Sequence, residues 1–310
     1  MFAVRVLSLG FSLCLVPGLL FGQEANAAKY RLRYQVTLGE KLHYKVTQKS
    51  SMLQKFAGNE RLDSNEVHEQ KYYRVTSVEP DGAIELEPFF EHVRMSAKFG
   101  KDGAPIEYDS AVDKEIPAPF RTVEGAVGRP RPRVSLTVEG RLLQIGGKQV
   151  TKRKGTKSVP VTDPVARQQI LAYQNIMIAM PVEEVAVGDR WTELLLTQVE
   201  VAKDVQRDIQ LLRSYKLNSV SEGIAEITFT TALHSPVRRP DQLMQLIQSK
   251  PSGVIRFDID RGRIVSRTTV LEGQVFNPFG KNGMFDARTE RVETLSAAPI
   301  ARVPSANGVN

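Results

Sequence analysis

Hydrophobic and polar positions alternate along most of the chain. This period of two predicts β-strands, because successive side chains of a strand point to opposite faces of a sheet. In "KLHYKVTQKSSM" (41–52), for example, Leu42, Tyr44 and Val46 fall on one face. Similar alternation, or runs of β-branched and aromatic residues, recurs in segments 30–38, 72–90, 133–145, 190–202, 214–233, 253–271 and 288–295. The pattern predicts a mainly β protein.

Short turn sequences separate these predicted strands. Pro80-Asp81-Gly82 interrupts segment 72–90, and Asp-Gly supplies the backbone angles that a tight hairpin turn needs. Glu139-Gly140 interrupts segment 133–145 in the same way. Strands joined by such turns pair in opposite directions, so we expect antiparallel sheets.

Two segments have helical spacing instead. Segment 163–180 begins with Asp163 as a candidate N-cap and Pro164 at the first helical position. Segment 239–250 carries an apolar stripe of Leu243, Met244, Leu246 and Ile247. We expect these one or two helices to cover the sheet. The tail 296–310 is small, polar and proline-containing, and we expect it to be disordered.

The turn and strand patterns recur in one order in the two halves of the chain. Gly39-Glu40-Lys41-Leu42 matches Gly188-Asp189-Arg190-Trp191, and the later matches are 73–87 with 215–228, 106–109 with 255–258, and 140–143 with 262–265. This order predicts an internal duplication of two related β modules. We assign the first module to 28–160, with an insertion near 110–136, and a helical connector plus the second module to 161–295. Leu42 and Trp191 would then hold equivalent, mostly buried places.

The N-terminus has the layout of a cleaved signal peptide. A positive charge at Arg5 precedes an apolar run from Val6 to Phe21, and Ala25-Asn26-Ala27 provides small residues for cleavage after residue 27. We therefore expect a secreted or periplasmic protein with no transmembrane segment once residues 1–27 are removed. The one cysteine, Cys14, would leave with the signal.

The chain is basic, with a net charge of +7. Two stretches contain no acidic residue: "GRPRPR" (128–133) and "KQVTKRKGTK" (148–157), both predicted to be loops. They could contact lipid head groups or another anionic component of the cell envelope, or they could be solvated loops that aid solubility. No aromatic residues alternate with these lysines, and an exported chain is a poor partner for nucleic acid.

Several motifs together resemble a known family. They are "GEKLHYKV" (39–46), "IEYDSA" (106–111), "VSLTVEGRLLQI" (134–145), "MPVEEVAVGDRW" (180–191) and "GVIRFDIDRGRIVS" (253–266). The pattern is similar to that of an uncharacterised family of secreted bacterial proteins, a domain of unknown function with duplicated β modules. A looser likeness is to the half-barrels of periplasmic lipoprotein carriers, which hold acyl chains, and this likeness implies sheets of the curved or half-barrel type. These resemblances imply no catalytic residues.

Residues with catalytic or metal-binding chemistry are sparse. The four histidines, His43, His68, His92 and His234, lack the spacing of metal ligands. Ser110 has no nucleophile elbow around it, and Asp258 and Asp260 lack the remaining ligands of a calcium loop. We therefore predict no catalytic residues, metal site or cofactor, and a protein that is not an enzyme.

Two classes of function remain open. The chain could be a binding or carrier module for an apolar or amphiphilic ligand, lined by Leu243, Met244, Ile247 and Trp191. Met and Leu side chains adapt well to acyl chains. Alternatively, it could be a structural or protein-interaction component of the cell envelope. A large cavity between sheet and helices favours the carrier, and a filled core favours the structural role.

Overall fold

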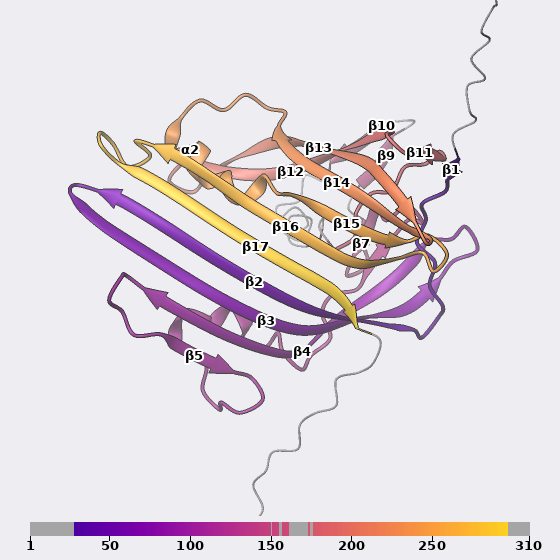
Figure 1. Ribbon diagram of the computed structural model, residues 1–310, viewed down its shortest axis with the longest axis horizontal. Helices are drawn as coiled ribbons and strands as arrows, with labels where there is room; N and C mark the ends of the chain where they lie inside the picture. Colours follow the sequence, from indigo (N-terminus) through magenta and orange to yellow (C-terminus); the bar gives the residue numbers. More distant parts are fainter. Residues whose placement is uncertain (1–27, 150, 155–156, 161–172, 174–175, 297–310) are drawn as a thin grey trace, which may run out of the picture.

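The computed structural model describes residues 28–149, 151–154, 157–160, 173 and 176–296. The predicted signal peptide and the predicted disordered tail beyond Ser296 lie outside these residues. The protein is mainly β, as the alternation predicts, and its long strands form an open antiparallel sheet that curls around an interior (Figure 1).

The strands of the first half are β1 (Lys29–Tyr30), β2 (Lys41–Phe56), β3 (Asn59–Val78), β4 (Ile84–Phe99), β5 (Ile106–Asp109), β6 (Val134–Leu136), β7 (Leu142–Ile145), β8 (Lys148–Gln149), β9 (Thr151–Lys154) and β10 (Lys157–Pro160). Those of the second half are β11 (Val185–Ala186), β12 (Arg190–Ala202), β13 (Val205–Ser221), β14 (Ile224–Leu233), β15 (Ser252–Asp258), β16 (Arg263–Phe276) and β17 (Met284–Ser296). The 3-10 helix η1 (Ala118–Val123) lies within the predicted insertion. Because β8, β9 and β10 are strands, the prediction of a loop over 148–157 is wrong.

The two halves share one continuous sheet. Its strand order is β12-β13-β14-β15-β16-β17-β2-β3-β4-β6-β7-β8, with β5 beside β4. The joint between the halves is the pair β17–β2, which runs antiparallel from Met284 opposite Lys55 to Ser296 opposite His43. The last described strand of the chain therefore pairs with its first long strand in the middle of the sheet.

The turns at Gly39-Glu40 and Gly188-Asp189 have the same local structure. The amide of Gly39 donates to the carbonyl of Val75 at 3.0 Å, and the amide of Gly188 donates to the carbonyl of Leu217 at 2.8 Å. Each glycine has a positive φ, 81° and 100°, which glycine adopts without steric strain. The sheet register then places Leu42 opposite Tyr73 and Trp191 opposite Tyr215.

The match extends along both hairpins. A bulge follows Val75 in β3 and Leu217 in β13, and the next pairs are Ser77 with Glu85 and Ser219 with Glu226. The predicted match of 106–109 with 255–258 does not follow this register. The strand β5 pairs the far part of β4, whereas β6 occupies the place beside β4 that β15 occupies beside β14. Descent of the halves from one duplicated unit stays a prediction.

The segment after β1 lies across the ends of both hairpins. Only Lys29–Tyr30 is a strand, so most of the predicted strand 30–38 is extended chain outside a ladder. The amide of Tyr34 donates to Val138 between β6 and β7, and the amide of Gln35 donates to Gly262 between β15 and β16. Leu32 and Tyr34 are buried in the main core by this crossing.

The second predicted helix is confirmed in a shorter form. Helix α2 spans Pro240–Gln245 and is followed by the 3-10 helix η2, Ile247–Ser249. The first predicted helix, 163–180, lies mostly outside the described residues. Its C-terminal part, Ile176–Met180, is not helical, and Met177–Met180 are buried. This part enters the core as irregular chain.

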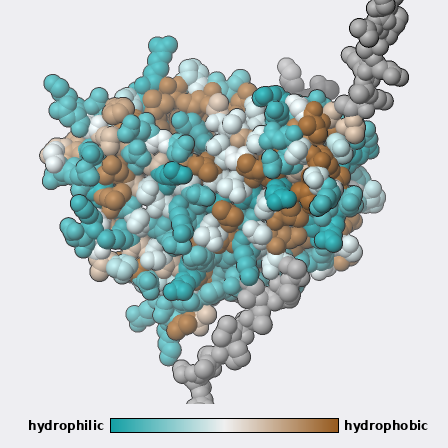
Figure 2. Space-filling view, in the orientation of Figure 1, coloured by the Kyte–Doolittle hydropathy of each residue, from teal (hydrophilic) through white to brown (hydrophobic). Residues whose placement is uncertain are grey.

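The outer face of the sheet carries mostly hydrophilic side chains with scattered hydrophobic ones (Figure 2). This follows from the alternation. In β13 the buried positions Leu211, Tyr215 and Leu217 are separated by partly exposed residues. Within the described ranges, no helix is long and apolar enough to cross a membrane.

Candidate functional site

A cavity of about 400 Å³ lies on the concave face of the sheet. Its walls come from both halves: β3 and β4 on one side, β13, β14, β16 and β17 on the other, with the connector residues Tyr173, Ile176 and Ile178 between them. The volume falls in the range of about 300–1,000 Å³ typical of small-molecule sites.

One part of the wall is aromatic and aliphatic. Phe89, Phe90 and Pro88 come from β4, Phe229 from β14, and Leu271 from β16. Phe89 stacks on Tyr72 with ring centroids 4.9 Å apart, which fixes its orientation. The connector adds Ile176 and Ile178, and Ile178 is held by Tyr34, whose hydroxyl oxygen accepts from the Ile178 amide at 3.1 Å.

The other part of the wall is unusually rich in charge for a buried surface. Five cationic side chains line the cavity: Lys71, Arg131, Arg213, Arg267 and Arg291. They face two carboxylates, Glu69 in the lining and Glu293 bonded to Lys71 and Arg267. Positive charge is therefore in excess at this surface, and an anionic group would lower its electrostatic energy.

Glu293 is the centre of the buried network. Its carboxylate accepts from Lys71 Nζ at 2.7 Å and from Arg267 Nη2 at 2.5 Å. Lys71 Nζ also donates to the Tyr73 hydroxyl at 2.8 Å. Burial by itself raises the pKa of the Glu293 carboxyl, but the charges of Lys71 and Arg267 outweigh it and hold that pKa far below its ordinary range.

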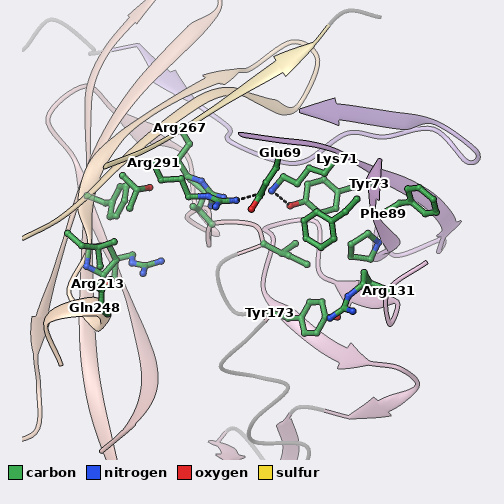
Figure 3. A pocket seen from close by; sticks show the side chains of 18 residues that line it. Glu69, Lys71, Tyr73, Phe89, Arg131, Tyr173, Arg213, Gln248, Arg267 and Arg291 are labelled. Carbon is green, nitrogen blue, oxygen red and sulfur yellow. Dashed lines mark hydrogen bonds and ion pairs between the residues drawn. The ribbon is translucent and has the colours of Figure 1, made fainter. Parts of the chain in front are cut away.

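A second ion pair joins the same strands. Arg291 Nη2 of β17 donates to Glu69 Oε2 of β3 at 3.0 Å (Figure 3). Arg267 and Arg291 therefore each have an acidic partner. The Lys71–Glu293 and Arg291–Glu69 pairs both cross from β3 to β17, so they also tie the two halves of the sheet together on its concave face.

Arg213 differs from these two arginines. Its side chain lies on the inward face of β13, and only 4% of its surface is exposed. Its Nε donates to Thr231 Oγ1 at 3.1 Å, and its guanidinium carbon lies 5.4 Å from the centre of the Phe229 ring. Among the described residues, no carboxylate forms an ion pair with it.

The four residues predicted to line a ligand site lie elsewhere. Trp191 is half-buried, stacks on Tyr215 at 5.4 Å, and donates through Nε1 to the carbonyl of Ala179 at 2.8 Å. Ile247 is fully buried, and Leu243 and Met244 are half-buried on α2. None of the four is in the cavity lining, although Gln248, next to Ile247, is. Their contact with a ligand stays a prediction.

One predicted basic loop borders the cavity. Arg131 of segment 128–133 lines it, and the Arg131 amide donates to the carbonyl of Pro88 at 2.9 Å. The amide of Gly128 likewise donates to Phe90. This loop is attached along β4 and is not simply solvated. Lys148 and Gln149, at the start of the other basic stretch, are not among the lining residues.

The histidines form local pairs. His43, His68 and His92 bond to Glu91, Glu66 and Asp109 at 3.2, 3.0 and 2.6 Å, and His234 is exposed. In the part of the chain that the structure describes, no group of His, Cys, Asp or Glu side chains could hold a metal ion. Asp258 accepts from the Arg261 amide at 2.8 Å, so it stabilises a hairpin turn.

The buried cations were not predicted from the sequence, although they occupy inward positions of the alternating strand pattern. On β3 the inward positions 67, 69, 71, 73 and 75 include Glu69 and Lys71 between apolar residues, and on β13 Arg213 lies between Leu211 and Tyr215. A charge at an inward position of an otherwise apolar face is the signal that could have found them.

Comparison with known proteins shows no family. No family model matches the chain, and no curated protein matches it. Among solved structures it is similar to lipovitellin, in a study of lipid–protein interactions, at 12% identity and a TM-score of 0.45. That match covers 86% of this chain but only 26% of the lipovitellin chain.

Two further solved structures are similar over most of their length. DynF, from the dynemicin biosynthesis pathway of Micromonospora chersina, has 7% identity and a TM-score of 0.22, covering 89% of this chain and 88% of its own. A DUF1329 family protein from Desulfovibrio piger has 9% identity and a TM-score of 0.12, covering 82% and 84%. At such TM-scores, none of these likenesses supports a shared activity, and membership of a family of unknown function stays a prediction.

Proposed function

We propose that this protein is a secreted or periplasmic binding module that carries an apolar or amphiphilic ligand in the cavity on its concave face. The observation that carries the proposal is the cavity itself, about 400 Å³ with aromatic and aliphatic side chains along one wall. A filled core would have favoured a purely structural role. Export is proposed from the signal-peptide pattern in residues 1–27.

The proposal assigns binding and not catalysis to the site. The ionisable groups at its centre are engaged with one another, Lys71 and Arg267 with Glu293, and Arg291 with Glu69. A carboxylate held by two cations, with a pKa far below its ordinary range, is a poor general base at neutral pH. The paired charges therefore support a structural role for these groups in the cavity wall.

A fluorescent fatty acid whose emission changes on leaving water tests the proposal. If the protein is a carrier, the fatty acid should bind saturably, with a stoichiometry near one ligand per chain. Thr269→Trp places a large ring in the lining and should abolish binding. Thr268→Trp is the matched control, because Thr268 neighbours Thr269 on the strand, points to the opposite face and is not in the lining.

A folded sample that shows no saturable binding to a panel of lipids and fatty acids would contradict the carrier function. Equal loss of binding in the two tryptophan variants would also argue against the cavity as the binding site. Circular dichroism of each variant checks that the sheet is intact.

The alternative is a structural or interaction component of the cell envelope. Large hydrophobic side chains are exposed near three hairpin ends: Phe56 (51%), Phe276 (62%) and Phe99 (41%). Residues 56 and 276 are close to one another, because Met284 pairs with both Lys55 and Phe276. Loss of a partner on Phe56→Ser and Phe276→Ser, with ligand binding unchanged, would favour this role.

A further inference from the structure

Arg213 holds a positive charge where burial makes it costly. It occupies an inward position of β13 between Leu211 and Tyr215, which are 2% and 1% exposed. A buried charge is destabilising unless an opposite charge or a set of hydrogen bonds compensates it. The Nε donation to Thr231 uses one of the five N–H donors of the guanidinium.

The acidic residue opposite Arg213 offsets its charge only in part. Glu193 lies opposite Arg213 in the register of β12 and β13, but its carboxylate accepts from the Tyr215 hydroxyl at 2.8 Å. Burial raises the pKa of the Glu193 carboxyl and outweighs the lowering by the Tyr215 bond and the charge of Arg213, which favours the neutral form. No ion pair joins it to Arg213 among the described residues. Arg267 and Arg291, by contrast, each have a carboxylate partner.

The guanidinium of Arg213 lies at the wall of the cavity. Arg213 belongs to the lining, and in Figure 3 its terminal nitrogens extend from β13 toward the side on which Tyr73 and Phe89 lie. Phe229 packs along the guanidinium as a cation–π partner, which holds its plane in place. Arg213 also shares a side-chain hydrogen bond with Tyr215, so its guanidinium is held in place at the cavity wall.

We propose that the cavity selects amphiphiles with an anionic head, a carboxylate or a phosphate, and that Arg213 binds this head. The assignment rests on the proposed carrier function and names its ligand class. The planar fork of arginine matches two oxygens of either head group. The aromatic and aliphatic wall formed by Phe89, Phe90 and Leu271 then receives the apolar chain.

Binding of one anionic head also reduces the charge imbalance of the wall. Five cationic side chains line the cavity, and among the described residues they interact with three carboxylates, those of Glu69, Glu293 and Glu193. Because the head would be buried, its attraction to Arg213 is screened weakly by salt. Attraction to the exposed basic stretches would instead fall steeply as salt rises.

The test compares a carboxylate with the alcohol of the same chain length. Titration calorimetry of the full chain with dodecanoate and dodecanol measures both affinities, and acetate and inorganic phosphate serve as anions without a chain. Wild-type protein should bind dodecanoate roughly ten- to a hundredfold more tightly than dodecanol, the gain expected from a charged hydrogen-bonded pair. Raising the salt from low to physiological concentration should change this ratio little.

Arg213→Gln should remove this preference by weakening dodecanoate binding roughly ten- to a hundredfold while changing dodecanol binding about twofold or less. Arg213→Lys keeps the charge and should restore part of the preference. Arg256→Gln is the matched control, because Arg256 is an exposed arginine on β15 outside the lining, and it should leave both affinities unchanged.

The outcomes separate the two proposals. If wild-type protein binds dodecanoate and dodecanol equally well, or Arg213→Gln weakens both equally, the head-group assignment is wrong and the carrier function stands. If inorganic phosphate or acetate binds as tightly as dodecanoate and displaces it, the ligand is a free anion and the amphiphile assignment fails. If no amphiphile binds the wild-type protein, the carrier function itself fails. The comparison of acid with alcohol needs no variant, so it remains decisive if Arg213→Gln does not fold.

Discussion

Replacing Glu293 by glutamine should destabilise the protein strongly, because it leaves two buried cations without their shared carboxylate. Glu293 is 3% exposed and Lys71 is 6% exposed, and Glu293 accepts from Lys71 at 2.7 Å and from Arg267 at 2.5 Å. Removing one partner of a buried ion pair costs about 3–5 kcal/mol. That is a large part of the roughly 5–15 kcal/mol by which proteins are stable.

Urea unfolding followed by circular dichroism measures this free energy. Glu290→Gln is the matched control, because Glu290 is an exposed glutamate on the same strand. It should change the unfolding free energy by less than about 0.5 kcal/mol, as surface substitutions usually do. Adding Lys71→Met to Glu293→Gln should recover part of the loss, since it removes one unpaired cation.

The pH dependence has a defined sign. The pKa of Glu293 is lowered in the folded protein from its ordinary value of 4.5, which it has in the unfolded chain. The stability that Glu293 contributes is therefore fully present above about pH 4.5. It is lost as the pH falls below about 4.5 toward the folded pKa. Wild-type protein should therefore lose stability faster than Glu293→Gln on acidification. Equal stabilities of Glu293→Gln and Glu290→Gln at neutral pH, or parallel acid profiles of Glu293→Gln and wild type, would refute the reasoning.

Substitutions at Trp191, Gly262 and Phe257 test the packing, the first two each with a comparison variant. Trp191→Ala should lower the free energy of unfolding by about 3–5 kcal/mol, at the lower end because the ring is half-buried. Trp191→Phe should lower it by about 1 kcal/mol, because the hydrogen bond to the carbonyl of Ala179 is lost. Chemical unfolding measures both. Gly262→Ala should lower the melting temperature more than Gly147→Ala. A Cβ at residue 262 would lie 2.4 Å from the amide nitrogen of Gln35, whereas a Cβ at residue 147 would have no atom within 4 Å. Equal melting temperatures of the two variants would contradict this. Phe257→Ala should cost about 3–5 kcal/mol, since the ring is fully buried against Tyr34, and a loss below 1 kcal/mol would show that the site collapses around the gap.

The strand pattern was predictable from the sequence because alternation is a local property. The hairpins around Asp81-Gly82 and Glu139-Gly140 and the helix near 240–249 follow from residues that are neighbours in the chain. The continuous sheet was not predictable in this way. Its joint, β17 with β2, pairs residues that are more than two hundred positions apart, and nothing local in either strand specifies the other.

The site was harder to predict for the same reason. Leu243 and Met244 were chosen by residue type, but the cavity is defined by where the sheet curls and by where residues distant in the sequence, such as Tyr173 and Phe229, come together. Lys71 and Arg213 look like ordinary solvent-facing residues until the inward face of each strand is known. Only the fold shows that Glu293 can reach Lys71 and Arg267 and that Arg213 forms no ion pair among the described residues.

The pairing of β17 with β2 has a consequence for how the chain folds during synthesis. The hydroxyl of Thr289 donates to that of Ser50 across 239 positions, so this ladder cannot form until the last long strand has left the ribosome. Until then β2 presents thirteen residues of unpaired edge, from His43 to Lys55, to any other nascent chain. Contacts between residues so far apart in the sequence also slow folding, because the entropy of closing a long loop is lost before the stabilising contacts form. We therefore expect slow maturation and a strong dependence on chaperones that cover exposed strand edges, and a premature stop codon before residue 284 should yield an aggregate and not a smaller folded protein.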